Sequence, residues 1–204
     1  MRFPLMSKIE DYKHIFAVAG LTGILLLASP AFSIFLRLPD GEKFSELWIL
    51  GPEHMMENYP FKVRFGENYK VYIGVGNHMD SSAYYLVYVK LRNQTEPLPN
   101  VTAETPSPLL PIFVYSIFLE NGGTWEQLLN FSFQDVSFNG DRCLVGNLMV
   151  NGVTVNVDKY ALWDSENNGY FYQLFLELWI YDAASRNFRF HNRFVGLWLN
   201  VTNI

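Results

Sequence analysis

Short runs in which apolar and polar residues alternate dominate the chain after residue 37. In "YKVYIGVGN" (69–77) every second residue from Val71 to Val75 is apolar, the pattern of a strand with one buried face. The run "YYLVYVKLR" (84–92) alternates in the same way. The turn-like "HMDSS" lies between the two runs, so the pattern predicts a β-hairpin.

Further runs predict more strands. "LMVNGVTV" places Asn151 and Gly152 between β-branched and apolar residues, a strong signal for a hairpin turn. "GYFYQLFLELWIYDA" and "NFRFHNRFVGLWLNVT" predict a last pair of long strands joined through "DAASRN". Shorter candidates are "SELWIL", "FKVRF", "PIFVYSIFLE" and "TWEQLLNFSF". No run after residue 37 keeps a long 3.6-residue period, so we predict an all-β fold, an immunoglobulin-like antiparallel β-sandwich.

Residues 37–204 are more than an immunoglobulin domain of about 100 residues needs. Two stretches are therefore predicted to be insertions. One is the Pro-rich stretch at 93–111, and the other is 138–168, which holds the Asn-Gly hairpin and a polar segment.

A different pattern fills residues 15–36, which carry no charge over 22 positions. As a helix this segment would be about 33 Å long, enough to cross a hydrocarbon core of about 30 Å. Basic residues precede it, so a single transmembrane helix would leave residues 1–14 in the cytoplasm and 37–204 outside the cell. The alternative is a cleaved signal peptide, with small residues at Ser29-Pro30-Ala31. Both interpretations export the C-terminal domain, and the first places the protein in the cell membrane.

Export makes four Asn-x-Ser/Thr triplets candidate N-glycosylation sites, at Asn93, Asn100, Asn130 and Asn200. Asn93 and Asn100 lie in the Pro-rich stretch, which is expected to be an exposed loop, so glycans are predicted there first. Asn130 and Asn200 lie in strand-like runs and are weaker candidates.

The stretch "FSELWILGPEHMMENYPFKVRFGENYKVYIGVGNH" has a recognisable order of short motifs. A strand ends in Leu-Gly-Pro, Glu-Asn-Tyr-Pro and Gly-Glu-Asn-Tyr follow, and the next strand closes in Gly-x-x-Asn-His. With "NGGTWEQLLNFSF" (121–133), it resembles the exported domain of the archaeal membrane-protein family known as "domain of unknown function 1616". The resemblance implies an immunoglobulin-like β-domain behind a membrane region. It implies no activity and no catalytic residues.

Composition and spacing narrow the function classes. The formal net charge is -5 and the basic residues form no stripe, so no nucleic-acid partner is predicted. Cys143 is the single cysteine, which rules out an internal disulfide and is expected to be a small buried hydrophobe. The histidines after the N-terminal segment, His54, His78 and His191, show no zinc-ligand spacing, so no metal or cofactor is predicted.

No nucleophile elbow, phosphate-binding loop or converging pair of acids is recognisable. Glu177 is the one acid embedded in an apolar strand run, and it is expected to face outward or to pair with Arg189 or Arg193.

The expected function is therefore that of a membrane-anchored, glycosylated surface protein whose β-domain is not an enzyme and binds an envelope protein or a glycan. The alternative is a carbohydrate- or ligand-binding module, and an enzyme with an unrecognised site is a third class. The apolar final run, "RFVGLWLNVT", is a candidate sheet edge for a partner, unless "YQLFLELWIY" pairs with it fully.

Overall fold

The computed structural model describes residues 12–24 and 42–202 of the 204-residue chain. The chain divides into two units, Met1–Glu42 and Lys43–Ile204. In the first unit, residues 12–24 form a helix. No helix within the described residues is both long enough and apolar enough to cross a membrane. Residues 25–36 of the predicted span lie outside the described residues, so the transmembrane helix stays a prediction.

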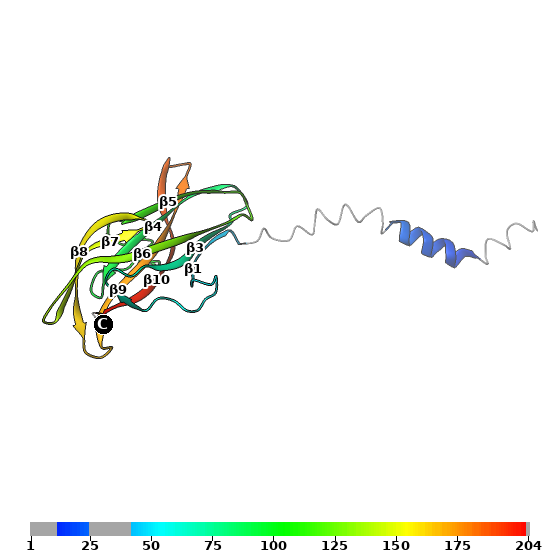
Figure 1. Ribbon diagram of the computed structural model, residues 1–204. Helices are drawn as coiled ribbons and strands as arrows, with labels where there is room; N and C mark the ends of the chain where they lie inside the picture. Colours follow the sequence, from blue (N-terminus) through cyan, green and yellow to red (C-terminus); the bar gives the residue numbers. More distant parts are fainter. Residues whose placement is uncertain (1–11, 25–41, 203–204) are drawn as a thin grey trace, which may run out of the picture. The chain divides into compact units, whose positions relative to one another are not determined.

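In the second unit, the described residues form ten strands joined in one curled sheet (Figure 1). Their bounds are β1 Phe44–Leu50, β2 Lys62–Arg64, β3 Tyr69–His78, β4 Ala83–Asn93, β5 Phe113–Leu119, β6 Thr124–Asn139, β7 Arg142–Val150, β8 Val153–Asp164, β9 Gly169–Asp182 and β10 Asn187–Thr202. The predicted all-β class is confirmed. The finer prediction of an immunoglobulin-like sandwich is taken up below as part of our proposal.

The curled sheet has two halves. The first half has the order β1-β3-β6-β7-β8, and the second has the order β5-β4-β9-β10-β2. The end of β8 joins them, because Trp163 and Asp164 pair with the start of β9. All pairings between these strands are antiparallel except the parallel pair β2–β10.

Strands β3 and β4 do not form the predicted hairpin. β3 pairs with β1 and β6, whereas β4 pairs with β5 and β9. The two strands each have one largely apolar face, and both faces are buried in the same core. Packing face to face buries both of these surfaces, which edge-to-edge pairing alone would not do. The chain therefore crosses between the halves at the "HMDSS" turn.

The core lies between the halves. Phe133 of β6 and Tyr172 of β9 bring their rings to 6.0 Å across it. Eight inward residues of β4 and β9 are at most 2% exposed, and each large aliphatic one contributes about 1.5–3 kcal/mol through burial. They are Tyr85, Val87, Val89, Leu91, Tyr172, Leu174, Leu176 and Leu178.

The segment 138–168 is built into the same sheet as β7 and β8, and it supplies core residues such as Cys143 and Val145. Its predicted Asn-Gly hairpin is confirmed. Asn151 and Gly152 have φ angles of 49° and 82°, the left-handed conformations that a tight two-residue turn requires.

β10 pairs with β9 from Asn187 to Val201, so the sequence alternative, full pairing with the preceding strand, is confirmed. On its other side β10 pairs with β2 only from Asn200 to Thr202, and no other described strand pairs with that side between Asn187 and Leu199. β5, at the end of the second half, pairs only with β4 among the described strands.

Candidate functional site

The outer face of the second half, which points away from the core, carries an unusual buried ion pair. Lys90 Nζ of β4 lies 2.8 Å from Glu177 Oε2 of β9, and the two side chains are 3% and 0% exposed. Both are bonded to the loop between β4 and β5. Ser107 donates its backbone N–H to Glu177 Oε1 at 2.8 Å and accepts from Lys90 Nζ at 2.9 Å through its carbonyl oxygen. We call these three residues the clasp.

Oε2 of the buried carboxylate accepts a second hydrogen bond besides that of Lys90. Trp179 Nε1 donates to Glu177 Oε2 at 3.2 Å. The expected partners Arg189 and Arg193 are therefore wrong, because the loop and Lys90 satisfy Glu177 instead. In the β4–β9 register Glu177 lies opposite Tyr88, which places Lys90 two residues along on the same face.

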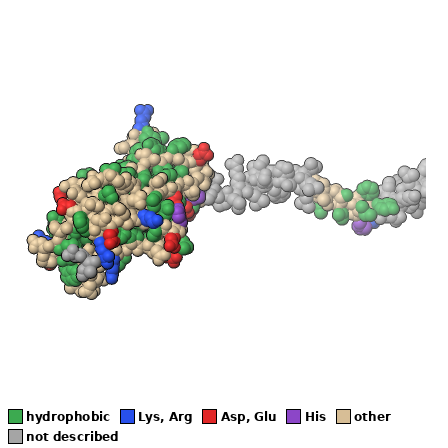
Figure 2. Space-filling view, viewed as in Figure 1, with side chains coloured by type: hydrophobic (Ala, Val, Ile, Leu, Met, Phe, Trp, Pro, Cys, Tyr) green, Lys and Arg blue, Asp and Glu red, His purple; other side chains and the backbone are tan. Residues whose placement is uncertain are grey.

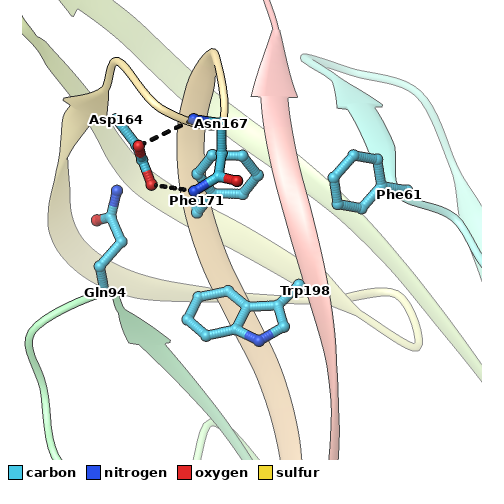
Figure 3. A pocket seen from close by; sticks show the side chains of 6 residues that line it. All are labelled: Phe61, Gln94, Asp164, Asn167, Phe171 and Trp198. Atoms are coloured by element: carbon cyan, nitrogen blue, oxygen red, sulfur yellow. Dashed lines mark hydrogen bonds between the residues drawn. The ribbon is translucent and has the colours of Figure 1, made fainter.

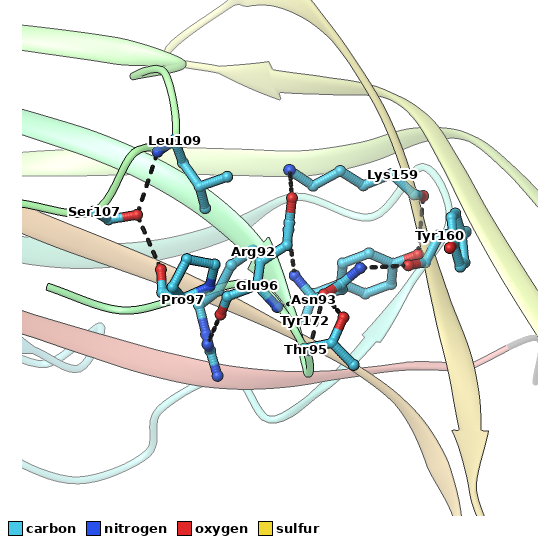
Figure 4. A network of polar contacts seen from close by, with 10 residues as sticks. All are labelled: Arg92, Asn93, Thr95, Glu96, Pro97, Ser107, Leu109, Lys159, Tyr160 and Tyr172. Carbon is cyan, nitrogen blue, oxygen red and sulfur yellow. Dashed lines mark hydrogen bonds and ion pairs between the residues drawn. The ribbon is translucent and has the colours of Figure 1, made fainter.

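A second network holds the start of the loop (Figure 4). Arg92 donates from Nε to Gln173 Oε1 at 2.9 Å and from a terminal nitrogen to the carbonyl oxygen of Glu96. Glu96 accepts from Lys159 Nζ at 2.5 Å and from the Asn93 N–H at 2.9 Å. With the clasp, these contacts fix the Pro-rich loop on the outer face at both ends.

Below the loop, the outer face opens into a pocket of about 470 Å³ (Figure 3). This volume lies within the usual range for small-ligand sites, about 300–1,000 Å³. Three aromatic side chains and three polar side chains line the pocket. They are Phe61, Phe171, Trp198, Gln94, Asp164 and Asn167.

The aromatic side chains come from three neighbouring segments. Phe61 precedes β2, Phe171 lies in β9 and Trp198 lies in β10. The rings of Phe61 and Phe171 are 6.1 Å apart and inclined by 40°. The backbone N–H of Asn200 donates to the carbonyl oxygen of Phe61 at 2.7 Å, which fixes this segment against β10. Phe61 is 49% exposed and Trp198 is 40% exposed, so both offer ring surface to a ligand.

The polar side of the pocket is the turn between β8 and β9. Asp164 Oδ1 accepts from the backbone N–H groups of Glu166 and Asn167, and Oδ2 accepts from Asn167 Nδ2 at 2.8 Å. These bonds, that of the Asn167 side chain first, lower the pKa of Asp164, so the group is a carboxylate near neutral pH. Gln94 Nε2 donates to the carbonyl oxygen of Leu162 at 2.8 Å. The side-chain amide nitrogens of Asn167 and Gln94 thus donate to other protein groups, and their carbonyl oxygens and the Asp164 carboxylate remain as hydrogen-bond acceptors.

Sequence reasoning missed this pocket. Its aromatic residues lie far apart in the chain and look like ordinary strand residues. The one local signal was "DSENNG", since an Asp before a Gly-ended polar stretch is typical of a side-chain-capped turn.

The predicted glycosylation sites differ in their surroundings. Asn93 is half-buried, and its Nδ2, the atom that a glycan would occupy, donates to the carbonyl oxygen of Tyr160 at 3.0 Å. Asn100 is exposed, and its Oδ1 accepts from the N–H groups of Thr102 and Ala103 at 3.0 Å. The Pro-rich stretch is therefore an ordered loop in which Asn100 is the more accessible residue.

The two strand sites also differ. Asn130 lies in β6 and is exposed, whereas Asn200 lies in β10 and is 4% exposed. The Asn200 amide donates to the carbonyl oxygen of Asn168 at 3.3 Å and accepts from the N–H of Tyr170 at 3.2 Å. Glycosylation at these positions stays a prediction, with Asn100 and Asn130 the sites whose side chains are open to solvent.

The histidines do not converge on a metal site. His54 Nδ1 lies 2.7 Å from Glu126, and His78 Nε2 lies 3.4 Å from Glu46. In residues 12–24 and 42–202, no three His, Cys, Asp or Glu side chains are grouped to hold a metal ion. Cys143 is buried, and burial raises its pKa to about 11, which keeps it a neutral thiol.

His191 contacts Ser45, a pairing that resembles a catalytic base and its nucleophile. The hydrogen bond, however, runs in the opposite direction, from the histidine to the serine. Asn77 Nδ2 donates to the carbonyl oxygen of Leu119, so Asn77 Oδ1 is left to accept from the Tyr85 hydroxyl at 2.9 Å. Tyr85 has one hydroxyl hydrogen, so Ser45 Oγ donates to Tyr85 at 2.7 Å. His191 Nε2 then donates to Ser45 Oγ at 3.0 Å. The histidine thus does not accept the serine proton as a general base would.

Charged side chains are spread over the face of the molecule that Figure 2 shows. On the face shown in Figure 2, Lys and Arg side chains lie apart from one another and Asp and Glu side chains are similarly scattered. That face offers no single-sign surface for a polyanion.

The comparisons with known proteins show the family. Residues 38–142, about half of the chain, match the family described as "Domain of unknown function (DUF1616)", and the chain belongs to this family. The sequence resemblance is confirmed. No curated protein matches the chain.

Solved structures show only distant likeness. A β-glucosidase from Listeria innocua is 12% identical and covers 80% of this chain, with a TM-score of 0.38. This chain spans only 17% of that β-glucosidase. The complex of Zinc 2-glycoprotein and Prolactin inducible protein from human seminal plasma is 8% identical over 81% of this chain and 100% of the matched one, with a TM-score of 0.38. The ASH/PapD-like domain of human CEP192 is 11% identical over 78% and 84%, with a TM-score of 0.28.

Proposed function

We propose that this member of the DUF1616 family is a non-catalytic binding domain whose outer pocket holds a neutral saccharide. The observation that carries the proposal is the triangle of Phe61, Phe171 and Trp198 beside the oxygens of Asp164 and Asn167. The domain then acts by contact with an envelope glycan, which joins the two function classes favoured by the sequence.

The aromatic side chains suit the apolar C–H face of a pyranose ring. Trp198 is held by Arg92, whose guanidinium carbon lies 5.2 Å from the indole ring centroid. One face of the indole is therefore covered by the cation, and the other remains for a ligand. Phe61 and Trp198 are exposed aromatic groups on one open face, the arrangement that favours stacking.

The polar groups suit hydroxyls. A saccharide hydroxyl is a donor, and Asp164 and Asn167 present acceptor oxygens. A carboxylate at the site disfavours acidic sugars, because two like charges would meet there. Within its turn Asp164 Oδ1 accepts two hydrogen bonds and Oδ2 accepts one, so Oδ2 can accept a further bond from a hydroxyl. Asp164 is the only ionisable group among the six lining residues. Glycoside cleavage needs two acids, so this favours binding without hydrolysis.

We further propose that the domain is an immunoglobulin-like sandwich displayed outside the cell, held by the 15–36 segment and glycosylated at its open Asn-x-Ser/Thr sites. The uncharged run of 22 residues and the four triplets support export. The two packed halves of the sheet support the sandwich.

The test is saccharide binding by the full chain in detergent, with neutral gluco-, manno- and chito-oligosaccharides as probes in calorimetric titrations. We expect one of these probes to bind, and Trp198→Ala to weaken its binding about tenfold or more, equal to about 1.4 kcal/mol. The matched control is Phe118→Ala, which removes an exposed aromatic side chain outside the pocket. It should leave binding unchanged.

Two outcomes would overturn the proposal. One is that none of the three probe series binds, and the other is that Trp198→Ala and Phe118→Ala weaken binding equally. Release of a shorter saccharide during the titration would contradict the non-catalytic part alone.

A further inference from the structure

A second pocket lies at the end of the sheet where β8 turns into β9. Its volume is about 600 Å³, and its walls come from the ends of β6, β8 and β10, from the start of β9 and from β2. None of its described lining residues also lines the outer pocket. None of them is acidic, and two of them, Lys62 and Arg64, are basic. We call this the basic pocket, an unusual surface in a chain of net charge -5.

Hydrogen-bond donors share one face of the β2–β10 pair at this pocket. In the parallel register Lys62 lies opposite Asn200, and Arg64 lies opposite Thr202. Val63, between the two basic residues, is fully buried in the core. Because side chains alternate along a strand, the two cations, the amide and the hydroxyl lie together on the face opposite to the core. All four residues line the basic pocket.

The Asn200 amide is fixed in place with one hydrogen to spare. Its Oδ1 accepts from the backbone N–H of Tyr170 at 3.2 Å, and its Nδ2 donates to the carbonyl oxygen of Asn168 at 3.3 Å. A Cβ atom on Gly169 would lie only 2.3 Å from this amide, so the arrangement needs glycine there. An amide nitrogen carries two hydrogens, so Asn200 can donate once more, to a ligand.

Aromatic rings form another wall of the basic pocket. Tyr170 lies between Phe138 and Trp163, with ring centroids 5.4 Å and 5.1 Å away. The Tyr170 hydroxyl donates to the carbonyl oxygen of Gly140 at 3.0 Å, which fixes the ring. Trp163 is 45% exposed, so its indole offers surface to the C–H face of a sugar ring.

The two cations are available to a ligand. Arg64 Nη1 lies 3.5 Å from Glu67 Oε1, and the two side chains are 57% and 50% exposed. Exposed pairs of this kind contribute little to stability, so the guanidinium can bond a ligand instead. A guanidinium binds a carboxylate through two parallel N–H groups, and the Lys62 ammonium adds a second charge. Two cations suit one carboxylate, not a long polyanion.

We propose that the basic pocket binds a single acidic sugar unit, a uronate. Its carboxylate lies on Arg64 and Lys62, its ring packs against Trp163, and its hydroxyls bond to the polar side chains of β10. The outer pocket has the opposite charge preference, because its one ionisable lining residue is Asp164. The inference therefore does not depend on saccharide binding in the outer pocket.

The test is calorimetric titration of the full chain in detergent. The probes are disaccharides of one neutral sugar and one glucuronate, galacturonate or mannuronate, each compared with its methyl ester. We expect at least one acid to bind about tenfold or more tightly than its ester, because esterification removes the charge that the two cations contact. Arg64→Gln and Lys62→Gln should each weaken binding of the acid about tenfold, and added salt should weaken it further.

Lys43→Gln is the matched control for Lys62→Gln, since it removes an exposed lysine outside the basic pocket. It should leave binding of the acid unchanged, and the circular dichroism of every variant should match that of the unchanged chain. The proposal is overturned if none of the three acids binds, if acid and ester bind equally, or if the two lysine variants weaken binding equally. Inorganic sulfate that binds as tightly as the acid would exclude recognition of the sugar. Loss of acid binding in Trp198→Ala would place the acid in the outer pocket instead.

Discussion

Strands β4 and β9 bury both of their faces, and they do so in two different ways. Their inner faces carry Val87, Val89, Leu174 and Leu176, which exclude water by apolar contact. Their outer faces also have a buried centre, but there a charged pair and the backbone of Ser107 form the contacts. An apolar face can pack against different apolar side chains of suitable volume, whereas a buried charge is stable only when its hydrogen-bonding and charged partners are present.

The loop explains the difference. On the inner side, β4 and β9 are covered by the other half of the sheet. The side chains that pack there differ in shape, but most of them are apolar. On the outer side, the cover is an irregular loop with backbone groups that must be bonded once they leave water. Lys90 and Glu177 bond the N–H and carbonyl of Ser107, so the ion pair gives the loop its anchor.

The largest effect is expected from removing one charge of the clasp. Lys90→Met leaves the Glu177 carboxylate buried with one partner fewer and should destabilise the folded domain by about 3–5 kcal/mol. Denaturant unfolding measures the change. Lys90→Met combined with Glu177→Leu removes both charges and should restore most of the stability.

The double variant also tests the anchoring role. The backbone N–H and carbonyl of Ser107 lose their side-chain partners, so limited proteolysis should cut the 94–112 loop faster than in the unchanged chain. A double variant as unstable as the single one would mean that the two outer residues are independent, and the contrast between the faces would be lost.

A somewhat smaller effect is expected on the inner face. Leu176 is fully buried, and Leu176→Ala should cost about 2–5 kcal/mol through lost burial and the cavity that remains. The same unfolding assay measures it. No second deletion should restore the stability, and the loop should be cut at the wild-type rate in the folded domain. Faster cutting of the folded variant would show that the faces are coupled.

The smallest effect concerns the end of the inner face, where Tyr85 bonds to Ser45 and thence to His191. Burial, with the nearby charges of Arg189 and Arg193, lowers the pKa of His191 to about 4 from an ordinary 6.5. Between these values the unfolded chain binds a proton that the folded chain does not. Stability is therefore fully present above pH 6.5 and should fall by about 1–2 kcal/mol towards pH 4, allowing for the partial exposure of the ring.

His191→Gln separates this contribution from that of other groups. Gln keeps a donor near the Nε2 position but does not titrate, so its stability should change less between pH 6.5 and pH 5. Denaturant unfolding at several pH values measures the difference. Parallel curves for the two proteins would show that His191 is not the group responsible.

The same contrast shows what the sequence could predict. Alternation in 69–77 and 84–92 identified β3 and β4 and their inner faces, because the period of a strand depends only on local geometry. It could not show that the two strands lie in different halves, since pairing is decided by which faces the whole chain must bury.

The pocket was harder to predict from the sequence than the strands were. Phe61 and Trp198 line one pocket because β2 joins β10 in parallel, a pairing with no local signal. Glu177 was recognisable as unusual, but its partner Ser107 is a backbone group in a loop, and any residue type supplies the same N–H and carbonyl.

The parallel β2–β10 pair also constrains the order in which the domain folds. Lys62 pairs with Asn200, which is 200 − 62 = 138 residues later in the chain. During synthesis, Val63 therefore stays without its final cover until the last strand has emerged. Contacts of such long sequence separation slow folding, so closure of this edge is expected to be a late step. Because Phe61 is bonded to Asn200 by its backbone, the pocket is completed only in that step.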